Sequence, residues 1–303
     1  MSSLLWIVVM VFYYVECVLA LSLNSCIVLL NGKSLYNGTK KNPSAVIQLI
    51  MGLINITMRG LLFTQFTAMF FPNFRFEGIY HVASFFLPFQ MYFSSWLISG
   101  LCAYYCICIV HFTQQVFIWV RRTLSSWLPW GLLLSGVGSI ALSVGNIWAV
   151  KITPMYYNGT LLVTSYIEII PLSLTYTAMS ICLGICLPFI ISSVSLLTTA
   201  VSLFRHIWKI KHQDSGFSPA QVQVHVNAIR TMIFLLLLDV IFYIAVMTVN
   251  NILSYTNTIS VACWIVVTVF PTLEAVIIIQ SSSELRKMVL GRLCASRTVE
   301  TGS

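Results

Sequence analysis

Long apolar runs separated by short polar segments are the dominant pattern of this chain. Each run is long enough for an α-helix to cross the hydrocarbon core of a bilayer, which takes about 20 residues. The pattern therefore predicts an all-α membrane protein, a seven-transmembrane helix bundle built as a single domain of residues 1–303, with a short tail over 282–303. The seven apolar windows are residues 4–30, 45–71, 82–118, 127–149, 176–204, 228–252 and 259–280.

The third window lies in the longest stretch that carries no Asp, Glu, Lys or Arg, residues 78–120. Glu77 precedes this stretch and the pair Arg121-Arg122 closes it. Its small residues allow neighbouring helices to approach closely. We expect either a long tilted helix or a helix with an interfacial lead-in near Pro88, buried among the other helices and followed by a loop at 121–126.

Composition excludes a soluble protein and the charge distribution predicts the topology. Of the 303 residues 58 % are hydrophobic and only 8 % are charged, against about 25 % charged in soluble proteins. The net charge of +8 does not indicate nucleic acid as a partner, because the basic residues fall between the apolar windows. Thirteen of the sixteen Lys and Arg lie in the first, third and fifth loops and the tail. By the positive-inside rule this side is cytosolic, which places the N-terminus outside and the C-terminus inside.

Motifs of catalysis are absent from the sequence. It contains no HExxH, GxSxG or P-loop pattern, and its five histidines do not cluster as a metal site. We therefore expect no enzyme activity, no cofactor and no metal. Among three Asn-x-Ser/Thr sequons, Asn158 is the expected glycosylation acceptor because it falls in the second outer loop, whereas Asn37 lies in an expected cytosolic loop and Asn55 lies within a span.

Four charged residues fall well inside the apolar windows, namely Glu16, Arg59, Asp239 and Glu274, whereas Arg230 lies at the edge of its window and is counted with the fifth loop. Charged side chains in a membrane are costly and almost always face the interior of the bundle. Arg59 therefore needs a carboxylate or carbonyl partner, and each of the three acids is a candidate. A static ion pair and a polar switch whose pairing differs between two states are both compatible with this pattern.

The first window also carries a polar stripe, since Glu16, Asn24 and Asn31 recur at steps of eight and seven residues. At 100° per residue these positions fall within an arc of about 80°. One face of the first helix is thus expected to point inward.

Short motifs lie in order along nearly the whole chain: Glu16-x7-Asn24-x6-Asn31, Arg59-Gly-Leu-Leu-Phe, Phe117-Ile-Trp-Val-Arg121 at the end of the third helix, Leu187-Pro188-Phe189, Ser202-Leu203-Phe204-Arg205-His206, His225-Val-Asn-Ala-Ile-Arg230 and Leu285-Arg286. Together they resemble the motifs of one receptor family, the vertebrate bitter taste receptors (type 2 taste receptors). The chain is similar to a divergent, non-mammalian member. Two departures are Cys108, where the family usually has Lys, and Glu274-Ala275 in place of His-Ser. Glu274 is thus an added acid, which favours it as the partner of Arg59.

The resemblance implies a G-protein-coupled receptor of the plasma membrane that binds bitter small molecules and activates a gustducin-type heterotrimeric G protein. It implies ligand contacts from Tyr92, Trp96, Ser99, Gly100, Phe242 and Trp264. If the buried charges act as a polar switch, its expected members are Glu16, Asn24, Arg59, Asp239 and Glu274. On the cytosolic face it implies contacts with the G protein from Arg121, Arg205, His206, His225 and Arg230.

Alternatives remain for the individual residues and for the class. Helix or lipid packing accounts equally for any one of the aromatic residues, and positive-inside topology accounts for the basic ones. The nearest rival class is a vomeronasal type 1-like pheromone receptor, which is related and lacks the same common receptor motifs. A seven-span transporter or channel is a further alternative, although the few intramembrane charges do not form a continuous polar path.

Overall fold

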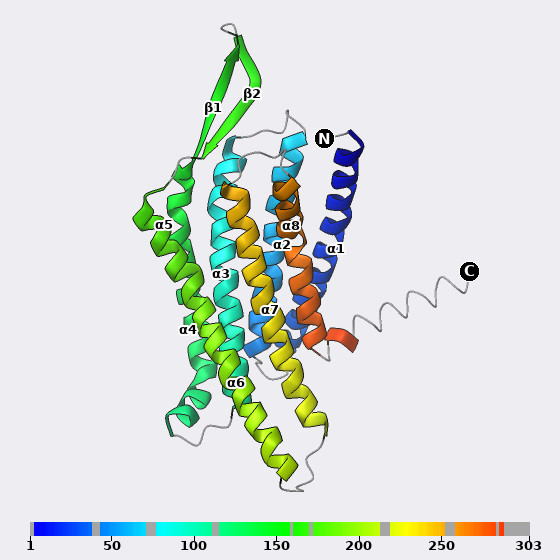
Figure 1. The fold of residues 1–303 in the computed structure, drawn as a ribbon, viewed down its shortest axis with the longest axis vertical. Helices are drawn as coiled ribbons and strands as arrows, with labels where there is room; N and C mark the ends of the chain where they lie inside the picture. The colour runs from blue at the N-terminus through cyan, green and yellow to red at the C-terminus, as the bar shows by residue number, and fades with distance from the viewer. Residues whose placement is uncertain are drawn as a thin grey trace, which may run out of the picture.

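Seven apolar helical segments run side by side as a bundle in the computed structural model (Figure 1). The structure describes residues 3–37, 43–70, 77–110, 115–157, 160–169, 172–212, 219–251, 258–282 and 285–287. The predicted seven-helix membrane bundle is confirmed. Its helices are α1 (Ser3–Tyr36), α2 (Pro43–Phe70), α3 (Glu77–Ile109), α4 (Gln115–Val144), α5 (Leu174–Ile181), α6 (Leu187–His212), α7 (Pro219–Asn251) and α8 (Thr258–Ser281).

Helices α5 and α6 form one membrane span, because the π-helical segment η3 (Cys182–Cys186) joins them without a break. The N–H of Leu187 donates to the carbonyl of Cys182, five residues earlier. Pro188 explains the wider turn, since a proline ring collides with the carbonyl four residues before it and offers no N–H. That carbonyl belongs to Gly184, at the middle of η3.

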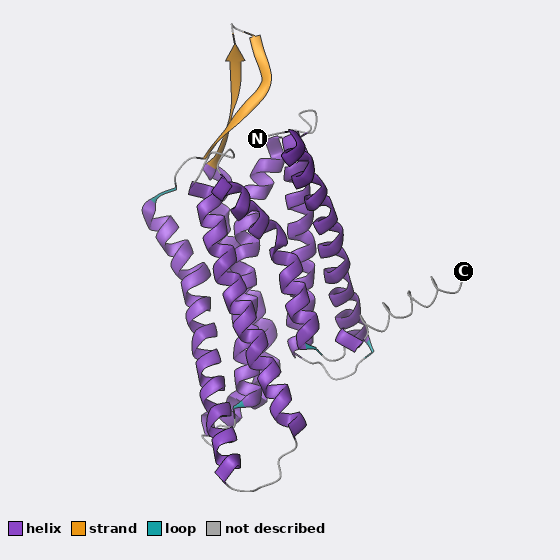
Figure 2. Cartoon of the chain, turned by 45° about the vertical axis from the view of Figure 1, so that its right-hand side comes forward, coloured by secondary structure: helices purple, strands orange, loops and turns teal. Residues whose placement is uncertain are grey.

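A β-hairpin projects from one end of the bundle (Figures 1 and 2). The short 3₁₀ helix η2 (Gly145–Ala149) leads from α4 into strand β1 (Val150–Tyr157), which pairs antiparallel with β2 (Thr160–Ile169). We call this end of the bundle, where α1 also begins, the hairpin end. At the opposite end α6 extends beyond the other helices (Figure 1). The hydropathy pattern predicts only a loop between the fourth and fifth spans, and the structure adds the hairpin there.

One expected boundary is wrong. The third span was expected to reach residue 118, but α3 ends at Ile109 and α4 begins at Gln115. The motif around Phe117 and the pair Arg121-Arg122 therefore belong to α4 rather than to the third helix and a following loop. The uncharged run continues across this boundary, and neither Gly nor Pro stands between 109 and 115 to mark it.

Helix α3 is the central element and α4 is a peripheral one. α3 packs against α2, α4, α6 and α7, and its inner positions are buried along most of its length. α4 instead exposes large apolar side chains such as Trp130 and Leu134. In a membrane these side chains face lipid, which is as apolar as they are.

Two apolar clusters form the core, one above the other. The hairpin-end cluster contains Tyr92, Phe242 and Phe270, and the opposite-end cluster contains Leu97 and Ile278. The same order recurs along four helices, with the first cluster nearer the hairpin and the second nearer the opposite end. Polar side chains lie between the two on α2, α3 and α8, and on α7 Asp239 lies at the inner edge of the hairpin-end cluster, next to Leu238; these side chains form the candidate site.

Candidate functional site

A buried layer of polar side chains crosses the bundle between the two apolar clusters. On α8, for example, the order is Phe270, then Glu274, then Ile278, and on α3 Ser94 and Ser95 follow the aromatic positions. We call this set the polar layer. Its members, all buried, are Glu16 and Asn24 of α1, Asn55 and Arg59 of α2, Ser94 and Ser95 of α3, Asp239 of α7, and Thr272 and Glu274 of α8.

Arg59 is fully buried and forms an ion pair with Glu16. Its Nη1 also donates to the carbonyl oxygen of Thr268 at 3.1 Å, and its Cζ lies 5.0 Å from the centroid of the Tyr13 ring. The guanidinium thus has an acid, a carbonyl and an aromatic face as partners, which is how a membrane interior tolerates a charge. Glu274, the acid favoured from the family departure, is not the partner of Arg59.

Two backbone oxygens of α8 at the turn of Pro271 accept hydrogen bonds from side chains of other helices. The carbonyl of Thr268 accepts from Arg59. The carbonyl of Pro271 accepts from Asn24 Nδ2 at 3.2 Å. These bonds join α8 to α1 and α2.

Hydrogen bonds carry the layer from α1 to α8 and α3. Asn55 Nδ2 donates to Asn24 Oδ1 at 3.1 Å and to Glu274 Oε2 at 2.6 Å. Ser94 Oγ lies 3.4 Å from the other oxygen of Glu274. Thr272 donates to Glu16 and so links the ion pair to the same helix, α8.

Asp239 is the contribution of α7 to the polar layer. Both of its carboxyl oxygens accept from Ser95 Oγ, at 3.1 and 3.0 Å. Because Ser94 and Ser95 are neighbours on α3, one turn of the central helix contacts the acids of two other helices. A shift of α3 would therefore disturb both acids together.

Three of the six residues expected to contact a ligand share the hairpin-end cluster. Tyr92 and Phe242 are buried members of it, and Trp264 packs against it. The rings of Phe242 and Phe270 are stacked with centroids 4.0 Å apart. Tyr92 lies directly against the backbone of Gly184, where an added Cβ would stand only 2.5 Å from the ring.

The other three expected ligand residues lie apart from this cluster. Trp96 is half-buried and Ser99 is buried, both on α3. A Cβ added at Gly100 would meet no heavy atom within 4 Å. The structure thus places space beside Gly100 but does not join it to the aromatic cluster.

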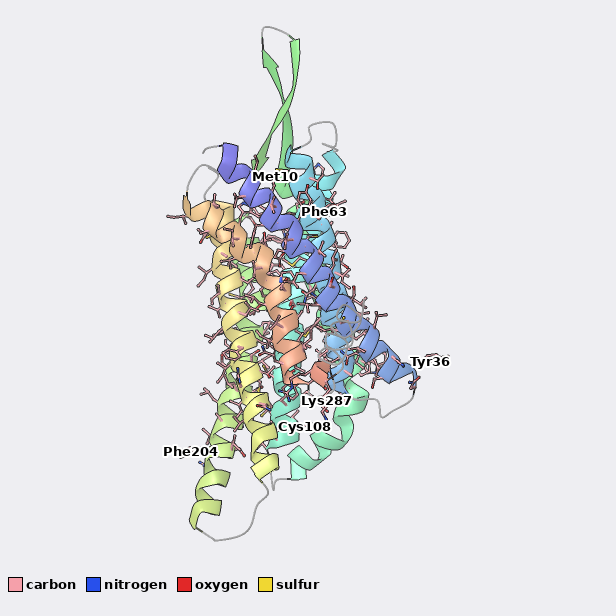
Figure 3. The ribbon with its side chains drawn as sticks, turned by 90° about the vertical axis from the view of Figure 1, so that its right-hand side faces the viewer. Met10, Tyr36, Phe63, Cys108, Phe204 and Lys287 are labelled. Atoms are coloured by element: carbon pink, nitrogen blue, oxygen red, sulfur yellow. The ribbon has the colours of Figure 1, made fainter. Side chains whose placement is uncertain are left out.

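The opposite end presents basic side chains. Arg205 and Arg230 are exposed, and Arg230 stacks over Phe234 at 5.3 Å. Cys108 and Lys287 lie toward this end, whereas Met10 and Phe63 lie toward the hairpin (Figure 3). The other basic residues expected here, Arg121 in α4, His206 in α6 and His225 in α7, have side chains outside the described set.

Leu285 anchors the short segment that follows α8. It is buried in the opposite-end cluster, and its N–H donates to Ser282 Oγ at 3.3 Å. Arg286 and Lys287, next to it, are exposed. The expected glycosylation acceptor, Asn158, lies outside the described residues.

Sequence reasoning missed Asn55 and the two serines of α3. Asn55 was considered only as a sequon, yet it bridges Asn24 and Glu274. Its position one turn before Arg59 on the same helix face was a usable signal, because residues four apart are neighbours on a helix. Within the described ranges no group of three His, Cys, Asp or Glu could hold a metal ion.

Comparisons with known proteins agree with this architecture. The family model "Taste receptor protein (TAS2R)" matches residues 1–297. The chain is 26 % identical over 285 residues to the Homo sapiens protein "Taste receptor type 2 member 2", covering 91 % of this chain and 92 % of that protein. It is 25 % identical over 295 residues to the Gallus gallus protein "Taste receptor type 2 member 40", covering 95 % of each.

A match over almost the full length decides the class. It favours neither a vomeronasal-type receptor nor a transporter or channel, and it indicates a receptor rather than an enzyme. The bundle of seven apolar helices is the fold that such a receptor requires. The chain belongs to the type 2 taste receptor (TAS2R) family of seven-helix G-protein-coupled receptors for bitter taste.

Proposed function

We propose that this protein is a plasma-membrane receptor that binds bitter small molecules in its hairpin half and activates a gustducin-type G protein at its opposite end. The observation that carries the proposal is the layered order of the bundle. An aromatic cluster on one side and exposed basic residues on the other are separated by a polar layer that joins five helices.

The hairpin-end cluster supports the assignment of the ligand end. Tyr92, Phe242 and Trp264 come from α3, α7 and α8 and share one apolar environment. Aromatic side chains with few polar groups suit apolar or amphipathic ligands. Trp96, Ser99 and Gly100 would extend the contact surface along α3 toward the polar layer.

The charge of the opposite end supports the assignment of the coupling end. Arg205, Arg230, Arg286 and Lys287 are exposed there, and the loops on this side hold most of the basic residues of the chain. The positive-inside rule places this end in the cytosol and the hairpin outside. The same charges would meet an acidic surface of the G protein, together with Arg121, His206 and His225.

The polar layer would connect the two ends. Its members Glu16, Asn24, Arg59, Asp239 and Glu274 come from four helices, so a ligand that shifts one of these helices changes the bonding of the others. Such a change is a shift of population between two states, driven by the ligand's higher affinity for one of them.

Calcium release in cells that co-express this chain and a promiscuous G protein tests the function. We expect release on addition of some members of a broad panel of bitter compounds, and none in cells without the receptor. Silence across the panel, with the receptor demonstrably at the cell surface, would contradict the proposal. Repeating the assay with gustducin in place of the promiscuous G protein tests the finer assignment of the partner.

Tryptophan substitutions test the ligand end. Trp264→Ala and Trp96→Ala should each shift agonist potency more than they reduce surface expression. Trp130→Ala is the matched control, because Trp130 is exposed on α4 away from the cluster. Parallel loss of potency and expression in the first two variants would assign both tryptophans to packing instead.

A further inference from the structure

The polar layer contains three acids and one base, all of them buried. The exposed fractions are 6 % for Glu16, 8 % for Asp239, and 0 % for Glu274 and Arg59. Arg59 is already paired with Glu16. In the part of the chain that the structure describes, no base forms an ion pair with Asp239 or Glu274.

Among the residues that the structure describes, the hydrogen-bond partners of the two remaining acids are neutral donors. Glu274 accepts from the amide of Asn55 and lies within reach of the Ser94 hydroxyl, and Asp239 accepts from the hydroxyl of Ser95. A hydroxyl can also accept a hydrogen bond, so each serine can serve a carboxylic acid as well as a carboxylate. The hydrogen bonds are therefore compatible with protonated acids.

Within the described ranges, the neighbouring helices bring no spare positive charge to these acids. α1 and α2 bring Glu16 and Arg59, which neutralise each other, and α1 also brings the neutral phenol of Tyr13. α3 brings the thiol of Cys102 near Asp239, and the Arg205 side chain of α6 is exposed toward the opposite end. Asp239 and Glu274 contact adjacent residues of α3, Ser95 and Ser94, so the two acids meet the same turn of that helix.

Two like charges in a buried membrane layer would be very costly. Moving an isolated carboxylate out of water costs several kcal/mol of solvation free energy, and in practice such a group takes up a proton and becomes neutral. For Glu16 this cost is offset by the ion pair with Arg59 and the hydrogen bond from Thr272. We propose that Asp239 and Glu274 are protonated in this state of the receptor while Glu16 is ionised, so that the bundle holds two protons that couple it to pH.

The sign of the coupling follows from linkage. In the unfolded chain an Asp or Glu is ionised at neutral pH, so the folded receptor binds more protons than the unfolded one. Its thermal stability should therefore fall as pH rises. By the same argument, and resting here on the proposed signalling function, a receptor state that admits water to the layer is favoured by higher pH.

Infrared spectroscopy of the purified receptor in lipid nanodiscs tests the assignment directly. A protonated carboxylic acid has a C=O stretching band that an ionised carboxylate lacks. At neutral pH the wild type should show such bands, and Glu274→Gln and Asp239→Asn should each remove one. Glu168→Gln in the hairpin is the control and should remove none, since an acid outside the membrane is ionised at this pH.

Two results would overturn the assignment. One is a wild-type spectrum without these bands, a measurement that needs no variant to fold. The other is a spectrum in which the bands appear only after sodium is replaced by choline. Bound sodium rather than protons would then neutralise the acids in the usual buffer. The measurement requires neither agonist nor G protein, so its result does not depend on whether the proposed receptor function is correct.

Discussion

The polar layer and the hairpin-end cluster lie next to each other but are held together in different ways. In the polar layer, the ion pair of Arg59 and Glu16 and directional hydrogen bonds join five helices. In the cluster, rings such as those of Phe242 and Phe270 meet by stacking and shape. Buried charges tolerate the loss of a partner poorly, whereas apolar packing tolerates changes of similar volume.

This difference suggests a division of roles. A layer that fails when one member is removed is suited to defining which helix faces meet. A cluster that tolerates substitution is suited to contacting ligands of varied shape. Substitutions in the polar layer should therefore reduce stability more than substitutions in the hairpin-end cluster.

The largest effect is expected for Arg59→Met. It leaves Glu16 as a buried carboxylate without its base, and breaking a buried pair costs about 3–5 kcal/mol. We expect strongly reduced surface expression and thermal stability, measured by flow cytometry of a tagged receptor and by thermal unfolding in nanodiscs.

A double-mutant cycle identifies the partner of Arg59. Arg59→Met combined with Glu16→Gln should recover much of the loss, because no buried charge then remains unpaired. The control combines Arg59→Met with Glu274→Gln. If that combination recovered as much, Glu274 rather than Glu16 would be the functional partner.

The second effect concerns the contact between Tyr92 and the π-helical segment. Gly184→Ala places a methyl group 2.5 Å from the Tyr92 ring, and overpacking of this kind costs about 1–3 kcal/mol. We expect reduced thermal stability together with altered agonist potency, because the fifth span would have to move away from α3.

Gly138→Ala is the matched control, since a Cβ at that position of α4 meets nothing within 4 Å. Tyr92→Leu should partly relieve the strain of Gly184→Ala if the ring is its cause. A loss that is unchanged by Tyr92→Leu would place the constraint in the backbone of η3 instead.

A smaller effect is expected for Phe242→Leu. The substitution keeps an apolar side chain but removes the stacking on Phe270, and such aromatic pairs contribute about 0.5–1.5 kcal/mol. We expect a modest decrease in thermal stability and a larger shift in agonist concentration dependence. Phe204→Leu on the exposed surface of α6 is the control, and equal potency shifts in the two variants would remove Phe242 from the ligand end.

The helices were predictable from the sequence because the bilayer sets their length and admits few charges. The inward stripe of α1 was also predictable, and the structure buries Glu16, Asn24 and Asn31 together. The end of α3 was not, because the segment between Ile109 and Gln115 has neither a charge nor a helix-breaking residue. Hydropathy detects membrane spans but not a break within an uncharged run.

The hairpin has a turn signal in the sequence, although the same residues also form part of a glycosylation sequon. Tyr157 pairs with Thr160 in the register of β1 and β2, and the sequence between them is Asn158-Gly159. Asn-Gly between β-forming runs is a strong hairpin signal, but Asn158 was considered only as a glycosylation acceptor. The partner of Arg59 had no comparable signal, since it depends on how α1, α2 and α8 are rotated against one another.

Gly100→Ala is expected to have the smallest effect on the fold and so provides a sensitive test for a ligand. A Cβ there meets no heavy atom within 4 Å, and alanine favours a helix over glycine by up to about 1 kcal/mol. Thermal stability should therefore be unchanged or slightly higher. If a ligand occupies the space beside α3, potency should fall while stability does not. Unchanged potency for every active compound would confine the ligand to the hairpin-end cluster, because a methyl group in an occupied site must displace some part of the ligand.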